Sequence, residues 1–231
     1  DYDIFGAREM VDEFSMVTRL LYRYSRINPR PYPIVASRSC PYNCTFCVHT
    51  RRDVPYRARS IGNILAEIKE AYEKYKFNIL LIQDELFAAN KQRIKDFCEG
   101  VLEGKRQYGW DFDWMFQTHA NAGLDLDSLK LAKEAGCFLF SYGLESASPK
   151  VLESMNKKIK IEQVTEVLQL AREARVGFSA NIIIGDVVED YKTIAESLEF
   201  WLHNAQDHCI FLSNLMPYPG SKLFADAQAK G

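Results

Sequence analysis

The sequence predicts an α/β protein with a parallel sheet, and three observations support this class. From residue 33 onward, short runs rich in β-branched and aromatic residues alternate with longer stretches whose apolar residues recur at helical spacing. The alternation occurs six times, which implies right-handed crossovers between parallel strands. The 231 residues, 47% hydrophobic and 26% charged, are enough for one substantial core. Two architectures satisfy these observations: a doubly wound open sheet and a curved partial barrel.

Strands are expected where β-branched and aromatic residues cluster between turn-forming residues. The predicted strands are residues 33–36, 78–83, 113–117, 137–142, 177–184 and 209–215. Gly136 and Gly177 each follow a helical run and open a strand, so we expect both to end a helix with a positive φ.

Helices are expected where apolar residues step by three and four, because such residues share one face that can cover the sheet. Between the first two strands these residues are Ile61, Ile64, Leu65, Ile68, Ala71, Tyr72 and Tyr75. The same spacing recurs in residues 94–102 and 161–171. Ser148 and Pro149 predict the N-cap and first turn of another helix, and a further helix begins at Lys222.

Composition narrows the function classes. The formal charge of −2 provides no basic surplus for phosphates, which argues against a nucleic-acid partner. No run approaches the roughly 18 to 20 apolar residues that span a bilayer, and no secretory signal is visible, so we expect a cytoplasmic protein without membrane contact. The six cysteines are expected to be reduced thiols, because three of them fall within eight positions of a large chain.

The domain organisation is expected to be simple. Residues 1–32 form a lead-in, with an amphipathic helix at residues 7–25, and residues 33–231 form the α/β domain. The chain begins with Asp1 rather than Met and ends just after a new helix begins, so we expect it to be an excerpt of a longer protein.

Three cysteines carry the strongest chemical signal. Cys40, Cys44 and Cys47 lie in a short loop just after the first strand. Three thiolates can bind three irons of a cubane cluster, and the missing fourth ligand leaves one iron open to a cofactor or substrate. The alternative is a zinc site, which usually needs a fourth ligand, and His49 is close enough in sequence to supply one.

The spacing CxxxCxxC, with an aromatic residue, Phe46, just before the last cysteine, resembles the signature of the radical S-adenosylmethionine (SAM) superfamily. The resemblance extends over residues 33–223 and implies a partial (β/α)6 barrel, open on one side. It implies that SAM chelates the open iron of a [4Fe-4S] cluster, and that an electron from the reduced cluster splits SAM to methionine and a 5'-deoxyadenosyl radical. It also implies an external electron donor such as flavodoxin or ferredoxin.

The resemblance also assigns residues at the carboxyl ends of successive strands, where a parallel α/β fold gathers functional groups. It implies cofactor contacts from Phe46, Asp84, Glu85, His119, Glu145, Lys157, Asn181, Gly185 and Pro217. Asp84 and Glu85 would lie near the SAM amino group, and Lys157 would pair with its carboxylate. Taken singly, these residues also fit a solvated loop, a surface carboxylate or a charged helix end. The segment after Gly185 departs from the family's common Gly-x-Pro-Gly-x-Thr pattern.

The pattern is most similar to the branch whose members often carry a cobalamin-binding domain before the barrel. That similarity implies methyl transfer, with cobalamin bound by a domain outside this chain, to a small-molecule or peptide substrate. The alternatives are a radical rearrangement, cyclisation or methylthiolation at the same SAM site, and a non-catalytic iron-sulfur or electron-transfer module. Cys98, Cys137 and Cys209 are expected to act as small hydrophobic residues, and Trp110, Trp114 and Trp201 as packing residues.

Overall fold

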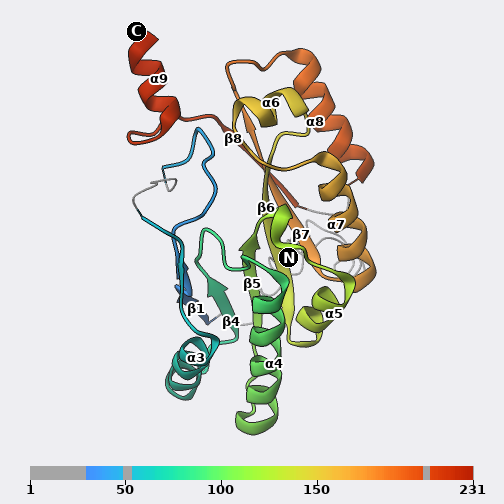
Figure 1. Cartoon of the computed structure of the whole chain (residues 1–231). Coiled ribbons are helices and arrows are strands. Elements are labelled where there is room, and N and C mark those ends of the chain that lie inside the picture. The colour runs from blue at the N-terminus through green and yellow to red at the C-terminus, as the bar shows by residue number, and fades with distance from the viewer. Residues whose placement is uncertain (1–29, 49–53, 205–208, 231) are drawn as a thin grey trace, which may run out of the picture.

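The computed structural model describes residues 30–48, 54–204 and 209–230, and its centre is one six-stranded parallel sheet (Figure 1). The strands follow the order β1-β4-β5-β6-β7-β8, so each new strand joins the edge formed by the one before it. Their bounds are β1 (Pro31–Ile34), β4 (Ile79–Ile82), β5 (Asp113–Thr118), β6 (Cys137–Glu145), β7 (Gly177–Ile184) and β8 (Cys209–Asn214). A doubly wound sheet would reverse direction at a switch point, which this order lacks.

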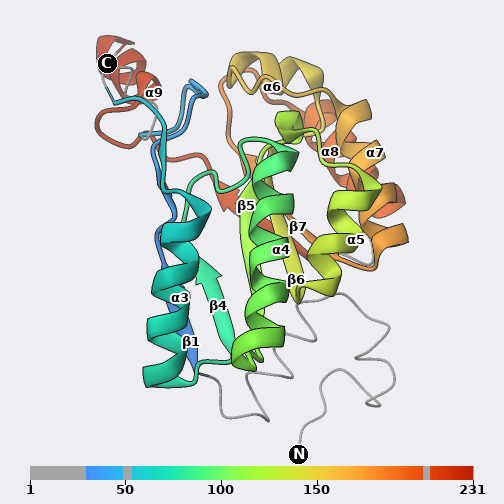
Figure 2. The same cartoon turned by 60° about the horizontal axis from the view of Figure 1, so that its bottom comes forward.

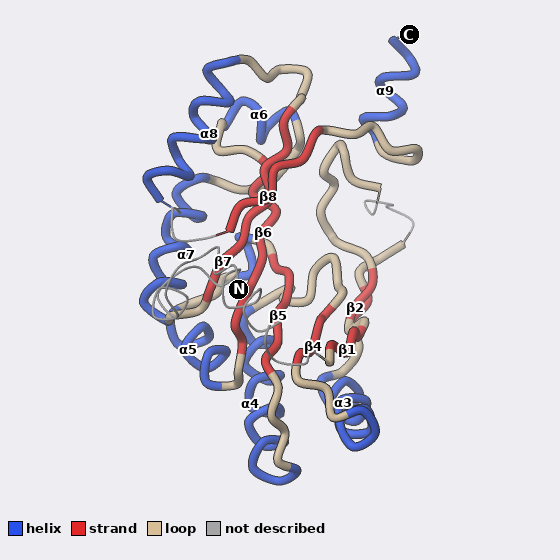
Figure 3. Tube along the Cα trace, turned by 180° about the vertical axis from the view of Figure 1, so that it is seen from behind, coloured by secondary structure: helices blue, strands red, loops and turns tan. Residues whose placement is uncertain are grey.

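The helices that connect the strands lie on one face of the sheet, as the tilted view and the view from behind both show (Figures 2 and 3). They are α3 (Ile61–Tyr75), α4 (Lys91–Tyr108), η1 (Ala120–Ala122), α5 (Leu126–Glu134), α6 (Pro149–Ser154), α7 (Ile161–Ala174) and α8 (Tyr191–Asn204). A last helix, α9 (Lys222–Lys230), stands apart from this layer. Helices on one face and consecutive strands are the arrangement of a partial barrel left open between β1 and β8.

An aromatic core joins the sheet to its helices. Phe97 of α4 packs edge-on against Trp114 of β5, with 4.9 Å between ring centroids, and Phe116 stacks on Phe140 of the next strand at 5.8 Å. All four rings are fully buried, and buried aromatic pairs of this geometry each add roughly 0.5–1.5 kcal/mol beyond their area. Cys98 and Cys137 are also buried, which confirms their predicted packing role; the side chain of Cys209 lies outside the described part.

The outer edge of β1 is protected against further strand pairing. The carbonyl of Ile34 points toward β4, since it accepts a hydrogen bond from the N–H of Gln83 at 2.8 Å, so Pro31 and Pro33 face the outer edge. Proline has no N–H to offer there. A short antiparallel ladder of β2 (Ser37–Arg38) and β3 (Arg57–Ala58) follows β1.

The predicted elements agree with the structure except in four places. The strand predicted at residues 137–142 continues to Glu145. The first strand begins at Pro31 rather than at residue 33, because an edge strand tolerates proline. Gly136 ends its helix with a φ of 96° as expected, but the prediction for Gly177 is wrong, since Arg175 takes the left-handed position with a φ of 53°. Ser148 is the N-cap of α6, but its side chain makes no capping hydrogen bond.

Some sequence predictions fall outside the described residues, including the helix at residues 7–25. The helix that begins at Lys222 is confirmed. Among the helices of the described ranges, none combines the length and the hydrophobicity needed to cross a bilayer.

Candidate functional site

The three cysteines lie on a loop that projects from the β2–β3 ladder on the side where the parallel strands end (Figure 1). Ser39 begins the loop in the left-handed region, with a φ of 67°, and its hydroxyl donates a 2.8 Å hydrogen bond to the carbonyl of Val54, which closes the loop at its base. The N–H of Cys47 bonds to the carbonyl of Cys44 at 3.2 Å. The turn that carries the thiols is therefore fixed by its backbone.

Two distant segments hold this loop from outside. The N–H of Thr45 donates to the carbonyl of Met155 at 3.0 Å, and the side-chain amide of Asn156 donates to the carbonyl of Asn43 at 2.6 Å. On its other side, the N–H of Leu223 in α9 donates to the carbonyl of Thr45 at 2.8 Å. The cysteine loop is thus docked against the segment that follows α6 and against α9.

A buried ion pair lies beside the loop. The ammonium of Lys157 is 2.9 Å from a carboxylate oxygen of Glu145, and both side chains are less than 9% exposed. Glu145 ends β6 with a φ of 67°, next to a register shift in the pairing of β6 with β7, so its carboxylate turns inward. Gly143 makes room for the pair, because a Cβ there would lie 2.1 Å from the carboxylate and 2.6 Å from the ammonium.

Charge and burial compete within this group. Burial lowers the pKa of Lys157, whereas the neighbouring Glu145 and Cys44 raise it. The raising effects together are larger, so the net pKa lies above its ordinary value. Burial raises the pKa of Cys44 to about 11 and also raises that of Cys40, while Lys157 acts in the opposite direction on both. Lys157 is therefore a charged group close to two of the three thiols.

His119 follows β5 and stacks on Tyr42 of the cysteine loop, with ring centroids 3.6 Å apart. Its Nδ1 accepts a hydrogen bond from the N–H of Asn121, so in the neutral ring the proton lies on Nε2. Burial, followed by the charge of Lys157, lowers the pKa of His119 to about 3. Nε2 is buried and has no hydrogen-bond partner within the described chain, and such a group usually has one.

Asp84 and Glu85, which follow β4, have different surroundings. Asp84 is 3% exposed, and its carboxylate accepts 2.7 Å hydrogen bonds from the N–H of Ala36 and the hydroxyl of Ser37. Burial raises the pKa of Asp84 and these hydrogen bonds lower it, with a net increase. Glu85 is exposed and lies within electrostatic range of Cys40. Asp84 thus joins the end of β4 to the start of the ladder that carries the cysteine loop.

The predicted residues of the last two strands lie further along the same edge. Asn181 is half-buried on β7, and Gly185 follows that strand with a φ of 112°. Two acidic side chains fix the segment after Gly185 through hydrogen bonds. Asp186 accepts a 2.7 Å hydrogen bond from the hydroxyl of Ser154 in α6, and Asp190 caps the start of α8. Pro217, after β8, is exposed. Phe46, in the cysteine loop, is half-buried.

The donor set fits an iron-sulfur cluster better than a single metal ion. Within the described ranges, no three Cys, His, Asp or Glu side chains converge as ligands of one ion. Three cysteine thiols match the coordination of a cubane cluster that leaves one iron open, whereas a structural zinc site usually has four protein ligands. His49, the predicted fourth zinc ligand, lies outside the described residues. In the same region, the buried Nε2 of His119 has no hydrogen-bond partner among the described residues, so a bound cofactor could supply one.

The site contains strained backbone that no sequence motif predicts. Of the five non-glycine residues with positive φ in residues 30–48, 54–204 and 209–230, three surround the site: Ser39 before Cys40, Glu145, and Asn156 before Lys157. The other two, Lys76 and Arg175, end helices. Residues with strained backbone often cluster at functional sites. Of the three, only Asn156 belongs to a residue type that readily adopts a positive φ.

Comparison with known proteins places these features in a family. The family model "Radical SAM superfamily" matches residues 34–200. Over 197 residues the chain is 27% identical to an uncharacterised methyltransferase of Pyrococcus horikoshii, covering 85% of this chain and 42% of the relative. It is 26% identical to the anaerobic magnesium-protoporphyrin IX monomethyl ester cyclase of Cereibacter sphaeroides, covering 82% of this chain and 31% of the relative.

A solved structure shares the fold. The radical SAM methyltransferase TsrM from Kitasatospora setae, with cobalamin and a [4Fe-4S] cluster bound, superposes with a TM-score of 0.75 at 15% identity, over 86% of this chain and 36% of that protein. The chain spans less than half the length of the curated relatives it matches. The family model, which covers most of the chain, and the shared fold lead to one conclusion: the chain belongs to the radical SAM superfamily.

Proposed function

We propose that this chain holds a [4Fe-4S] cluster through Cys40, Cys44 and Cys47 and uses it to cleave SAM reductively, which starts radical chemistry on a substrate. One observation carries the proposal: the three-cysteine loop is docked at the carboxyl edge of the sheet beside a buried lysine and an unpartnered histidine nitrogen. Family membership implies both cofactors. When bound, the cluster supplies the electron that cleaves SAM.

The residues around the loop have separable tasks in this proposal. Lys157 has three N–H donors, of which one bonds to Glu145, so the others can bind the SAM carboxylate. Glu145 keeps the ammonium in place and offers a carboxylate to the amino group or ribose of SAM. His119 presents a neutral Nε2–H donor, held by its stacking on Tyr42. Asp84 positions the cysteine loop by accepting hydrogen bonds from Ala36 and Ser37, and in this proposal it does not bind the cofactor.

We extend the proposal to methyl transfer with cobalamin, bound by a domain that this chain does not include. Support comes from the methyltransferase relative and from the fold shared with TsrM, whose structure contains cobalamin. The cyclase relative supports the alternative, a radical cyclisation or rearrangement that begins from the same SAM site. The product formed from SAM separates these outcomes: S-adenosylhomocysteine accompanies methyl transfer, and 5'-deoxyadenosine accompanies hydrogen abstraction.

The direct experiment reconstitutes the protein with iron and sulfide without oxygen, adds dithionite and SAM, and follows both products. The Cys98→Ala variant is the matched control, because this buried cysteine lies in α4, away from the loop. We expect wild type and Cys98→Ala to consume SAM, and Cys44→Ala to lose the activity. A reconstituted wild-type protein that releases neither product would favour a non-catalytic iron-sulfur module.

Lys157 tests the SAM site separately from catalysis. Replacing Lys157 with Ala removes a charge-assisted hydrogen bond and should weaken SAM binding by about 1.5–3 kcal/mol. The measurement is a calorimetric titration of the reconstituted protein with SAM, with Lys158→Ala as the neighbouring control. Equal SAM affinity in wild type and Lys157→Ala would dismiss this assignment.

A further inference from the structure

The stem of the cysteine loop carries two like charges face to face. In the β2–β3 ladder, Arg38 lies directly opposite Arg57, and both side chains are exposed. Within the described part of the chain, neither guanidinium has a hydrogen-bonding or ionic partner. Like charges directly opposite each other destabilise an antiparallel pair, so stability of the ladder alone does not explain this arrangement.

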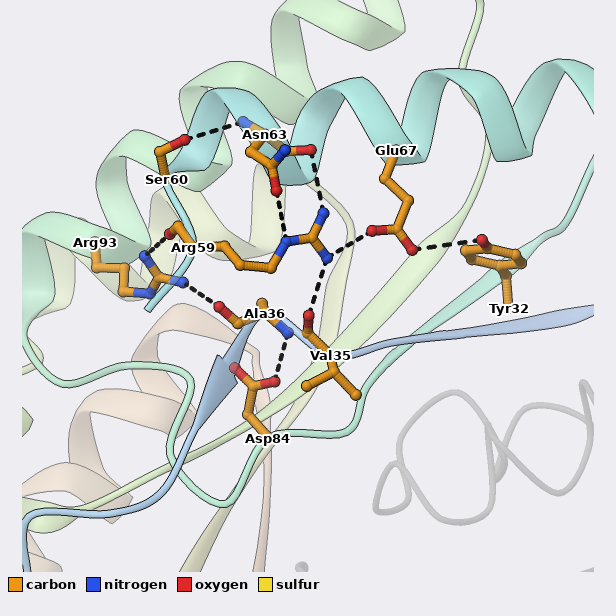
Figure 4. Close-up of polar contacts among 9 residues, drawn as sticks. All are labelled: Tyr32, Val35, Ala36, Arg59, Ser60, Asn63, Glu67, Asp84 and Arg93. Atoms are coloured by element: carbon orange, nitrogen blue, oxygen red, sulfur yellow. Dashed lines mark hydrogen bonds and ion pairs between the residues drawn. The ribbon is translucent and has the colours of Figure 1, made fainter. Parts of the chain in front are cut away.

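The residues next to the ladder, Ala36 and Arg59, are bonded to the rest of the domain, as Figure 4 shows. Arg93 donates to the carbonyls of Arg59 and Ala36 at 2.9 and 3.2 Å, and Asp84 accepts from the N–H of Ala36. Arg59 is fully used within the chain, because its guanidinium contacts Glu67 at 2.5 Å and donates to the carbonyl of Val35 at 2.9 Å. Arg59 therefore helps to build the base, while Arg38 and Arg57 remain the charges that face outward.

These two arginines border a cavity of about 560 Å³ at the open edge of β1. Pro33 and Val35, both exposed, also line it, together with the ion-paired Arg59 and Glu67. A surface that combines exposed apolar residues with arginines is suited to binding another protein. The edge strand is not available for strand pairing, so a partner would bind through side chains.

This surface adjoins the cysteine loop. Arg38 is two residues before Cys40, which limits the separation of their Cα atoms to about 7 Å. We propose that Arg38, Arg57 and the cavity beside them form the docking surface for an acidic one-electron donor protein. This inference rests on the proposed function, because SAM cleavage needs one electron from outside the chain. In the docked complex one electron leaves the donor protein and enters the cluster, and no proton or chemical group is transferred.

Charge complementarity sets the partner class. Two exposed guanidinium groups that lack an acidic partner among the described residues raise the association rate of an acidic protein, and this effect falls as the ionic strength rises. A small anion is the competing occupant. The structure favours a protein, because the two charges protrude from a ladder rather than converging in a buried pocket.

The test uses Arg57→Glu in the reconstituted protein. This change places a carboxylate opposite Arg38, which cancels both free charges and converts a repulsive pair into an attractive one, so the variant should fold with unchanged or higher thermal stability. The matched control is Lys192→Glu, which reverses an exposed charge at the start of α8, near the other edge of the sheet. Cluster reduction is followed by stopped-flow absorbance without oxygen, with reduced flavodoxin or with dithionite.

We expect the rate with flavodoxin to fall as salt is added to wild type and to Lys192→Glu. For Arg57→Glu, the rate at low salt should be about tenfold or more lower and nearly independent of salt. Reduction by dithionite should be equal in all three proteins.

Equal flavodoxin kinetics in wild type and Arg57→Glu would overturn the docking proposal. Saturable binding of inorganic phosphate that Arg57→Glu abolishes, without a change in flavodoxin kinetics, would assign the arginines to a small anion instead. Slower dithionite reduction of the variant would place Arg57 within the cluster site and also overturn it. Failure of the proposed function is distinguishable, because it leaves wild type without a reducible cluster.

Discussion

Breaking the buried pair of Lys157 and Glu145 tests the geometry of the site through stability. At 2.9 Å and an effective dielectric constant of about 20, the attraction between the two charges is roughly 6 kcal/mol, partly offset by the cost of burying both. Lys157→Met leaves the Glu145 carboxylate buried without its partner, and such a change typically costs about 3–5 kcal/mol. The free energy of unfolding should fall by that amount.

The matched variant replaces both members, as Lys157→Met with Glu145→Met. Methionine approximates the volume of either side chain, and exchange of a buried ion pair for apolar residues is often neutral or stabilising. We therefore expect the double variant to be more stable than either single variant. Urea unfolding of the four proteins without oxygen measures the cycle. Additive losses, or a Lys157→Met variant as stable as wild type, would refute a buried, mutually compensating pair.

Three further predictions concern the surroundings of this pair. Gly143→Ala places a methyl group 2.1 Å from the carboxylate, so it should cost about 1–3 kcal/mol of stability and weaken SAM binding; Gly62→Ala, at a position with open space, is the calorimetric control. Ser197→Ala removes the hydroxyl of α8 that bonds to Ser146 and to the N–H of Ala147, and should lower the free energy of unfolding by about 1–3 kcal/mol in a urea titration. His119→Phe keeps a ring on Tyr42 but lacks the buried N–H, so it should weaken SAM binding more than it lowers the melting temperature; the reverse order would show a purely structural histidine.

Periodicity could predict the helices and strands whose buried apolar residues recur at regular spacing along the chain. The strand at residues 177–184 matches β7 because most of its residues are apolar and it begins shortly after the helix α7 ends at Ala174. The choice between an open doubly wound sheet and a partial barrel needed the strand order, which depends on pairings between distant segments. Periodicity alone contains no such information.

The candidate site also contains some residues that sequence spacing predicts and some contacts that it cannot predict. Spacing identified Cys40, Cys44 and Cys47, because a short loop brings its own residues together. The pairing of Glu145 with Lys157 could not be predicted, since it depends on a left-handed residue and a register shift at the end of β6. The bond between Asn156 and Asn43 joins segments far apart in sequence, and no local pattern encodes it.

The most direct test of the central claim measures the metal centre. After reconstitution without oxygen, the protein should contain about four iron and four sulfide per chain, and the electron paramagnetic resonance spectrum of the reduced centre should change when SAM is added. Cys40→Ala, Cys44→Ala and Cys47→Ala should each lose that content or hold it unstably. Zinc in place of iron, or an iron centre whose spectrum does not respond to SAM, would contradict the account.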